Sequence, residues 1–277
     1  MSKNELFLPT LCIGKQHPAK IIMSDFTYSQ CDNIGYNPFS LCRKEILIIG
    51  GTSNLEKSII DQLINNGASS IIVIDKNIES DHRFMSLDVN IYTPEGIESA
   101  IKHLQSENRS FNGVIFTKTE SDFRPIKMTS AKLACEIMNS NYLIFMEFMR
   151  LLLKRKMLVN GASVVAMSSI SSIHAMKAKA AFAAAKAALD SAVRCIACEL
   201  ADKGIRVNSI QKGGVDADMT KSHIQAVSEL NNGDEAKRQP LGLVKAKEIG
   251  NLISFLLSDA CTSITGTSIV IDGGYLL

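Results

Sequence analysis

The chain has 277 residues, 46% of them hydrophobic and 21% charged, and a formal net charge of +2 from 30 basic and 28 acidic side chains. This composition is typical of a globular protein with a substantial core, and the length fits one large α/β domain or two small ones. The near balance of charge argues against an electrostatic nucleic-acid binder. No apolar run reaches the roughly eighteen residues that a membrane-spanning helix needs.

The seven cysteines are scattered and odd in number, which is expected of a protein in a reducing compartment. Cys195 and Cys198 form a C-x-x-C pair inside an expected helix, but further metal ligands at a suitable spacing are not evident. We therefore expect packed core thiols and no metal site. The apolar residues near the N-terminus are interrupted by Pro9 and no small-residue cleavage site follows, so we expect a cytoplasmic protein.

Residues 1–44 precede the regular pattern of the rest of the chain and hold more apolar residues than a solvated arm tolerates. Short extended runs are expected at about 5–8 and 20–23, with turn-forming residues between them. Two interpretations stay open. The segment is either an arm that packs on its own domain or a contact surface for another subunit or protein.

From residue 45 onward, short apolar strands alternate with longer helices. Strands are expected at 45–50, 71–75, 84–89, 113–117, 163–167, 205–210 and 267–272. Helices are expected at about 55–64, from 94, at about 129–158, at about 178–203 and at 247–257, with a polar helical lid at 216–239. This alternation predicts an α/β fold, a Rossmann-like doubly wound parallel sheet. We expect a single domain at 45–277 with an N-terminal extension at 1–44.

The stretch 163–186, SVVAMSSISSIHAMKAKAAFAAAK, combines a buried strand, a serine-rich turn and an alanine-rich helix. Ser169 at the strand end and Lys186 in the helix are a plausible pair for stabilising an oxyanion and handling a proton. Phe182 precedes Lys186 by one turn and shares its helix face. Because phenylalanine has no proton to give, this helix lacks an acid at that position.

This layout resembles the short-chain dehydrogenase/reductase family, especially its 3-oxoacyl-carrier-protein reductase-like members, in which the position of Phe182 is the tyrosine of a Tyr-x-x-x-Lys motif. By that resemblance, Ser169 and Lys186 match the catalytic serine and lysine, and Asn141 matches the helical asparagine that completes the tetrad. In the family's mechanism the tyrosinate takes or gives the substrate proton, which Phe182 cannot do. His174 is either a substitute proton donor or a solvated loop side chain.

The resemblance implies NAD(P) as the cofactor, with its pyrophosphate at the N-terminus of the first helix. Gly50 matches the first glycine of the family's Thr-Gly-x-x-x-Gly-x-Gly turn, but Asn54 and Glu56 occupy the other two glycine positions. The carboxylate of Glu56 would compete with phosphate for the helix amides and repel it. The same carboxylate would stabilise an empty helix that caps itself.

Further cofactor contacts are implied along the same edge of the sheet. Asp75 would accept hydrogen bonds from the ribose hydroxyls of NAD, and Asp88 would flank the adenine; either fits equally well as a strand-end residue that caps a turn. Lys118 falls in the family's Asn-Asn-Ala-Gly segment, and Lys212 replaces the proline of its Pro-Gly-x-x-x-Thr segment. The other positions that match cofactor contacts are Ser53, Leu55, Val89, Lys186, Gly213 and Val215.

The resemblance covers about 45–277 and includes the closing run SITGTSIVIDGGY at 263–275. Departures concentrate in the cofactor and catalytic turns, whereas the core pattern is intact. Three functions stay open. The chain is a non-catalytic member that acts as a partner subunit or scaffold, an NAD(P)H-dependent 3-oxoacyl (keto) reductase with altered cofactor contacts, or a non-redox protein that binds an anion through Lys118, Lys186 and Lys212.

The expected helix around 132–158 is apolar on nearly every face, more than one domain's sheet can cover. The alanine-rich helix that follows it would let a neighbouring helix approach closely. In the family these two helices commonly pair with their symmetry mates, so we predict a homo-oligomer, a dimer or tetramer. A related reductase or another enzyme of the same pathway is the alternative partner.

Overall fold

The computed structural model describes residues 20–22, 37–51, 53–78, 81–120, 123–217 and 238–277. Within these residues, eight strands form one sheet in the order β1-β4-β3-β2-β5-β6-β7-β8. Strands β2 to β8 pair in parallel, and β1 pairs antiparallel with β4 at one edge. The strands are β1 Lys20–Ile22, β2 Glu45–Ile49, β3 Ser70–Asp75, β4 Met85–Asp88, β5 Phe111–Phe116, β6 Leu158–Ser169, β7 Arg206–Lys212 and β8 Ser268–Ile271.

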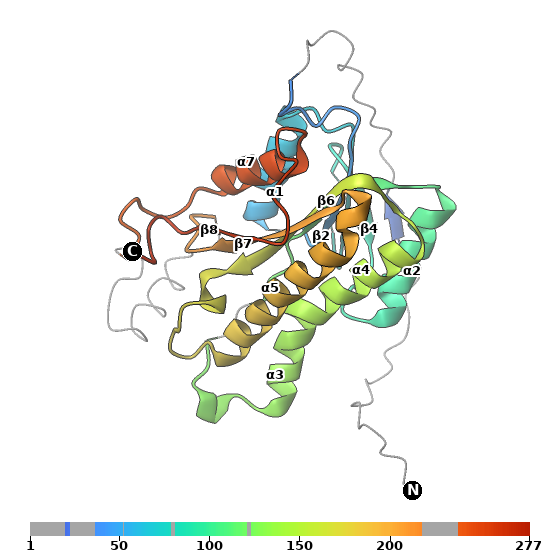
Figure 1. Ribbon diagram of the computed structural model, residues 1–277. Coiled ribbons are helices and arrows are strands. Elements are labelled where there is room, and N and C mark those ends of the chain that lie inside the picture. Colours follow the sequence, from blue (N-terminus) through green and yellow to red (C-terminus); the bar gives the residue numbers. More distant parts are fainter. Residues whose placement is uncertain (1–19, 23–36, 52, 79–80, 121–122, 218–237) are drawn as a thin grey trace, which may run out of the picture.

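Helices cover both faces of the sheet (Figure 1). On one face α1 and α7 pack against each other and share a core with β2 and β3, and on the other α2, α4 and α5 form the second core. The α-helices are α1 Asn54–Asn65, α2 Pro94–Ser106, α3 Ala131–Met138, α4 Ile144–Lys154, α5 Ala180–Leu200 and α7 Ala246–Leu257. The expected doubly wound α/β fold is confirmed.

Two helix starts are capped by side chains. Ser53 caps α1 with an extended backbone, and Thr93 caps α2 by accepting a hydrogen bond from the backbone N–H of Gly96, with Pro94 in the first turn. Such caps satisfy backbone donors that have no partner within the helix. Because α1 begins directly after β2, its N-terminus faces the carboxyl edge of the sheet.

The helix expected at 129–158 is interrupted. A π-helical turn at Asn139–Leu143 separates α3 from α4, the helix ends at Lys154, and β6 already begins at Leu158. The expected uncovered apolar stripe is also wrong for α4, because most of its apolar side chains are buried in the core that it shares with the sheet, α2 and α5. Among the large apolar side chains of 131–154, Leu143 is the exposed one, at 47%.

The expectation of packed core thiols is wrong for the C-x-x-C pair. Cys195 and Cys198 are exposed, whereas Cys261 is buried. The reason is helical phase, since the buried face of α5 runs through Val193, Ile196 and Ala197. Among the cysteines of the described residues, Cys42 is disulfide-bonded, and Cys135, Cys195, Cys198 and Cys261 are free. Among the described residues, no cluster of three or more histidine, cysteine or acidic side chains is arranged to hold a metal ion.

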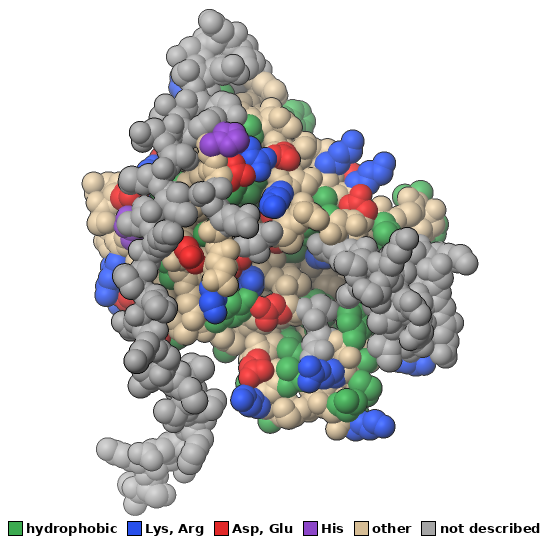
Figure 2. Space-filling view, turned by 180° about the vertical axis from the view of Figure 1, so that it is seen from behind, with side chains coloured by type: hydrophobic (Ala, Val, Ile, Leu, Met, Phe, Trp, Pro, Cys, Tyr) green, Lys and Arg blue, Asp and Glu red, His purple; other side chains and the backbone are tan. Residues whose placement is uncertain are grey.

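Strand β1 falls within the extended run expected at 20–23, and its pairing with β4 places this part of the N-terminal segment on the domain. The run expected at 5–8 and most of the expected lid, 218–237, lie outside the described residues. Basic and acidic side chains are interspersed over the face of the molecule in Figure 2, as the near balance of charge suggests. In the described part of the chain, no helix has the length and apolar character needed to cross a membrane.

Candidate functional site

The turn between β2 and α1 forms one end of the candidate site. Gly50 has φ +94°, and a Cβ at this position would lie 2.8 Å from the hydroxyl oxygen of Thr117 and 2.9 Å from the backbone nitrogen of Lys118. Only glycine combines this backbone conformation with such a close approach. The first glycine of the turn is therefore needed to bring the loop after β2 against the loop after β5.

The N-terminus of α1 is closed by the chain's own side chains. The hydroxyl of Ser53 accepts a hydrogen bond from the backbone N–H of Leu55 (3.2 Å), and the carboxylate of Glu56 accepts one from the backbone N–H of Ser53 (3.1 Å). The two side chains also contact each other directly, and Glu56 is buried. This is a capping box, which places a negative charge at the positive end of the helix.

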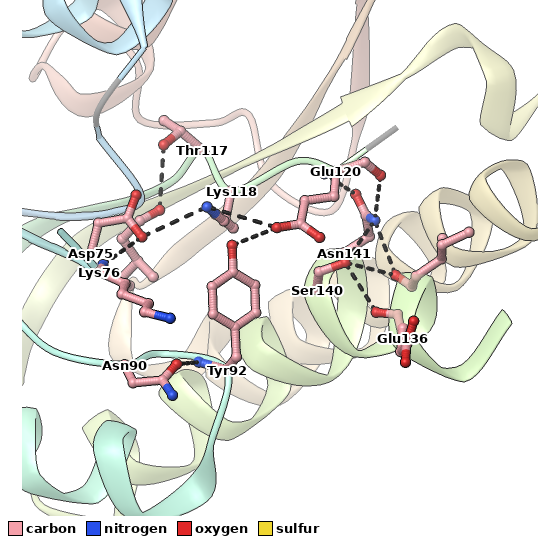
Figure 3. A network of polar contacts seen from close by, with 12 residues as sticks. Asp75, Lys76, Asn90, Tyr92, Thr117, Lys118, Glu120, Glu136, Ser140 and Asn141 are labelled. Carbon is pink, nitrogen blue, oxygen red and sulfur yellow. Dashed lines mark hydrogen bonds and ion pairs between the residues drawn. The ribbon is translucent and has the colours of Figure 1, made fainter. Parts of the chain in front are cut away.

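A polar network spans the next part of the edge (Figure 3). The carboxylate of Asp75, at the end of β3, accepts a hydrogen bond from the backbone N–H of Lys76 (2.8 Å) and lies 3.7 Å from the ammonium of Lys118. That ammonium lies 4.0 Å from the carboxylate of Glu120 and 5.0 Å from the ring centre of Tyr92. The hydroxyl of Tyr92 donates a hydrogen bond to Glu120. Burial, followed by the hydrogen bond and charge of Glu120, raises the pKa of Tyr92 above its ordinary value.

The neighbouring aspartate has a structural contact. The carboxylate of Asp88 accepts a hydrogen bond of 2.7 Å from the backbone N–H of Asn77, which has φ +59° in the turn after β3. Val89 is buried, and its backbone N–H donates to the carbonyl of Asp75. Asp88 thus caps a turn.

Asn141 lies in the π-helical turn and is fully buried. Its amide nitrogen donates to the carbonyls of Glu120 (2.8 Å) and Ile137 (3.0 Å), and its amide oxygen accepts from the backbone N–H of Glu120 (3.2 Å). These contacts fasten the loop after β5 to the helix. The asparagine therefore also positions the residue that contacts Lys118.

Ser169 and Lys186 have different partners from those expected for a direct pair. The hydroxyl of Ser169 lies 3.2 Å from that of Ser171. The ammonium of Lys186 donates to the carbonyl of Met167 (2.8 Å) and the hydroxyl of Thr119 (3.0 Å). Lys186 is fully buried, and this burial, followed by the positive charge of the neighbouring lysine at 212, lowers the pKa of Lys186 to about 7.

Phe182 occupies an apolar environment. Its side chain is 3% exposed and packs with Ile137 of α3 and Ala185 of its own helix. Its ring centre lies 5.7 Å from the ammonium of Lys186. The candidate catalytic set therefore contains an amide, a hydroxyl and an amine, with an aromatic ring in place of the family's phenol. The ring of His174 packs edge-on against that of Tyr275, with 5.4 Å between the ring centres.

The other end of the site follows β7. A Cβ at Gly213 would lie 2.8 Å from the Cα of Asp272, so the loop after β7 passes very close to the C-terminal segment. The side chain of Gln239 accepts a hydrogen bond from the backbone N–H of Gly214 (2.6 Å), and Val215 is buried in a parallel bridge with Val244. These residues hold the end of the site in place through backbone contacts.

Sequence reasoning did not find two of the site's residues, Tyr92 and Glu120, which follow strands but belong to no motif of the family. Thr119 falls in the family's Asn-Asn-Ala-Gly segment, but its contact with Lys186 was not expected. A charge pattern was nevertheless visible, because Lys118 and Glu120 are two residues apart after a buried strand and Asp75 ends another. Parallel strands bring such residues to one edge of the sheet.

Comparison with known proteins places the chain in a family. The model of the family described as enoyl-(acyl carrier protein) reductase matches residues 63–276. The chain belongs to the short-chain dehydrogenase/reductase family. It is an enoyl or 3-oxoacyl reductase-like member, as its sequence motifs suggest.

Among curated relatives, the cyclohexanol dehydrogenase of Acinetobacter sp. (strain SE19) is 24% identical over 253 residues, which cover 84% of this chain and 94% of that protein. An uncharacterized short-chain type dehydrogenase/reductase of Sinorhizobium fredii is 32% identical over 122 residues, 44% of this chain and 22% of the relative. A short-chain dehydrogenase/reductase of Botryotinia fuckeliana is 35% identical over 123 residues, 43% and 48% of the two. The chain thus matches between about a fifth and a half of these last two relatives' length.

Solved structures of the family share the fold. A short-chain dehydrogenase family protein from Francisella tularensis superposes with a TM-score of 0.75 at 25% identity, covering 84% of this chain and 98% of that one. A dehydrogenase/reductase from Sinorhizobium meliloti 1021 superposes with a TM-score of 0.76 at 20% identity, covering 87% and 98%.

Members of the family generally bind NAD(P), so the residues at the carboxyl edge can be tested against that cofactor. They do not fit it. Ser53 and Glu56 take up the helix N-terminus that would receive the pyrophosphate. The carboxylate of Asp75, which would receive the ribose hydroxyls, lies beside the ammonium of Lys118.

Proposed function

We propose that the chain is a short-chain dehydrogenase/reductase-like protein that has lost NAD(P)-dependent oxidoreductase activity and acts as a partner subunit or scaffold. The observation that carries the proposal is the ring of Phe182 beside Lys186, where the family has the phenol of its general acid. A phenyl ring neither gives nor takes a proton. The capped N-terminus of α1 and the contact between Asp75 and Lys118 add support, because both oppose a dinucleotide in the family's position.

Titration with NAD(H) and NADP(H) by calorimetry tests the proposal first, followed by an assay of hydride transfer to a 3-oxoacyl substrate. We expect no binding at micromolar concentration and no turnover above background. Purification of the native assembly then tests for the partner subunit. Micromolar binding of either dinucleotide together with hydride transfer would contradict the proposal.

The second candidate function is an NAD(P)H-dependent 3-oxoacyl reductase with altered cofactor contacts. It is favoured by Asn141, Ser169 and Lys186, which keep the family's residue types, and by relatives named dehydrogenases or reductases. Anion binding by a lysine cluster, the third function, receives less support, since Lys118 has the carboxylates of Asp75 and Glu120 beside it.

A homo-oligomer is part of the proposed function. The exposed face of α5 carries small side chains at helical spacing, namely Ala180, Ala184, Ala187, Ser191, Cys195 and Cys198. Members of the family commonly form oligomers, and small side chains allow helices to approach closely. This face, rather than α4, is the proposed contact between copies of the chain.

A further inference from the structure

The edge of the sheet where the fit to NAD(P) fails contains a cation-binding arrangement formed by three chain segments. Asp75 ends β3, Tyr92 lies between β4 and α2, and Glu120 lies in the loop after β5 (Figure 3). All three side chains surround the ammonium of Lys118, at 3.7 Å and 4.0 Å from the two carboxylates and 5.0 Å from the centre of the aromatic ring. Two carboxylates and a ring face are the groups that recognise an alkylammonium ion.

The burial of Asp75 makes this arrangement more than a surface ion pair. Asp75 is 2% exposed, and the hydrogen bond from the backbone N–H of Lys76 satisfies only part of its carboxylate. A buried carboxylate that loses its cation is strongly destabilising, whereas exposed ion pairs contribute little. Glu120 is half-exposed and is oriented by the hydroxyl of Tyr92. The requirement for a cation is therefore set mainly by Asp75.

We propose that Lys118 is the built-in ligand of a primary-ammonium site at this edge of the sheet, and that the site takes a free alkylammonium ion when the Lys118 side chain is truncated. Without Lys118 the site presents the two carboxylates of Asp75 and Glu120. That charge attracts an ammonium ion and repels the phosphates of a nucleotide. The inference concerns the same edge of the sheet as the proposed function, so its test measures stability and not activity.

The test compares thermal unfolding of the full chain and of Lys118→Ala, each with added n-propylammonium. The substitution keeps Cβ and removes a propylammonium group, so the free ion matches the missing atoms. The control for charge is 1-propanol, which has the same length without the charge. The matched control variant is Lys76→Ala, because Lys76 is an exposed lysine on the adjacent turn.

We expect Lys118→Ala to lower the Tm by ~5 °C or more, and n-propylammonium to recover most of that loss. Neither 1-propanol nor NAD(H) should do so, and Lys76→Ala should change little. Three results would overturn the proposal: no loss of Tm in Lys118→Ala, an equal gain from n-propylammonium in the unsubstituted chain, or a larger stabilisation of Lys118→Ala by NAD(H) than by the amine.

A double variant covers the case in which Lys118→Ala does not fold. Asp75→Asn with Lys118→Ala removes the carboxylate that needs the cation, so it should fold and show no response to the amine. A double variant that is as unstable as Lys118→Ala would contradict the role of Asp75. None of these results bears on the proposed loss of activity, because that proposal rests on Phe182 and is tested by hydride transfer.

Discussion

The ring of Phe182 lies 5.7 Å from the ammonium of Lys186 on the inward face of α5. In the family, the lysine at this position lowers the pKa of a tyrosine. Here the lysine faces a ring that does not titrate, and its hydrogen bonds go to the carbonyl of Met167 and the hydroxyl of Thr119. Lys186 therefore links α5 to β6 and to the loop after β5.

The first prediction concerns the missing acid. Without a phenol at 182, reduction of a ketone should be slower than in a tyrosine-bearing relative by the ~10²–10⁴-fold typical of general acid catalysis. Phe182→Tyr alone should not restore turnover, because the residues at the family's dinucleotide position are also altered. The measurement is oxidation of NADPH or NADH with a 3-oxoacyl substrate. Vigorous activity of the single variant would show that the chain still accepts a dinucleotide.

The second prediction concerns the turn before α1. Affinity for NAD(P) should be millimolar or weaker, which corresponds to about −4 kcal/mol. Asn54→Gly with Glu56→Gly should strengthen binding, because the substitutions remove the carboxylate and reduce bulk where phosphate would approach. The same variant should lose about 0.5–2 kcal/mol of stability with its cap. Calorimetry and denaturant unfolding measure the two effects, and Glu95→Gly in the first turn of α2 is the control for a helix-end acid elsewhere.

The sequence predicted the fold well because alternation of apolar strands and helices and the spacing of motifs are local properties. It also predicted that Glu56 would lie in the first turn of α1, since a capping box needs only residues that are close in the chain. The sequence did not predict the contacts of Lys118 with Asp75 and Glu120, because these contacts depend on how two loops meet at the sheet edge. The exposure of Cys195 was missed because the helical phase of α5 was not used.

The third prediction concerns pH. The pKa of Lys186 is lowered to about 7, chiefly by burial, whereas in the unfolded chain it has the ordinary value of a lysine. Between these two values the unfolded chain holds a proton that the folded chain does not, so stability should rise with pH from about 7 to about 10. Below about pH 7 both states are protonated and the full cost of the buried charge applies.

Lys186→Met should remove this pH dependence. The difference in free energy of unfolding between the unsubstituted chain and the variant should change by up to about 4 kcal/mol between about pH 6 and about pH 10. Denaturant unfolding at several pH values measures it, and Lys177→Met, at an exposed lysine, is the control. Parallel curves for the unsubstituted chain and Lys186→Met would contradict the lowered pKa.

The last prediction concerns assembly. We expect a stable homo-oligomer, a dimer or tetramer, without any added cofactor, formed through the exposed face of α5. Ala187→Arg should dissociate it, because a long charged side chain prevents close approach of two helices at an alanine. Ser106→Arg, at an exposed position on α2, adds the same side chain away from this face and should leave the assembly intact.

Light scattering measures the mass, and the two exposed thiols of α5 give an independent reading. In the oligomer, Cys195 and Cys198 should react more slowly with a thiol reagent than Cys135, which is exposed on α3. Ala187→Arg should remove that difference. A mass near 30.2 kDa for the unsubstituted chain at micromolar concentration, with no reductase subunit present, would contradict the prediction of a homo-oligomer. If a larger assembly forms only after a reductase subunit is added, that subunit is the partner that binds the exposed face of α5.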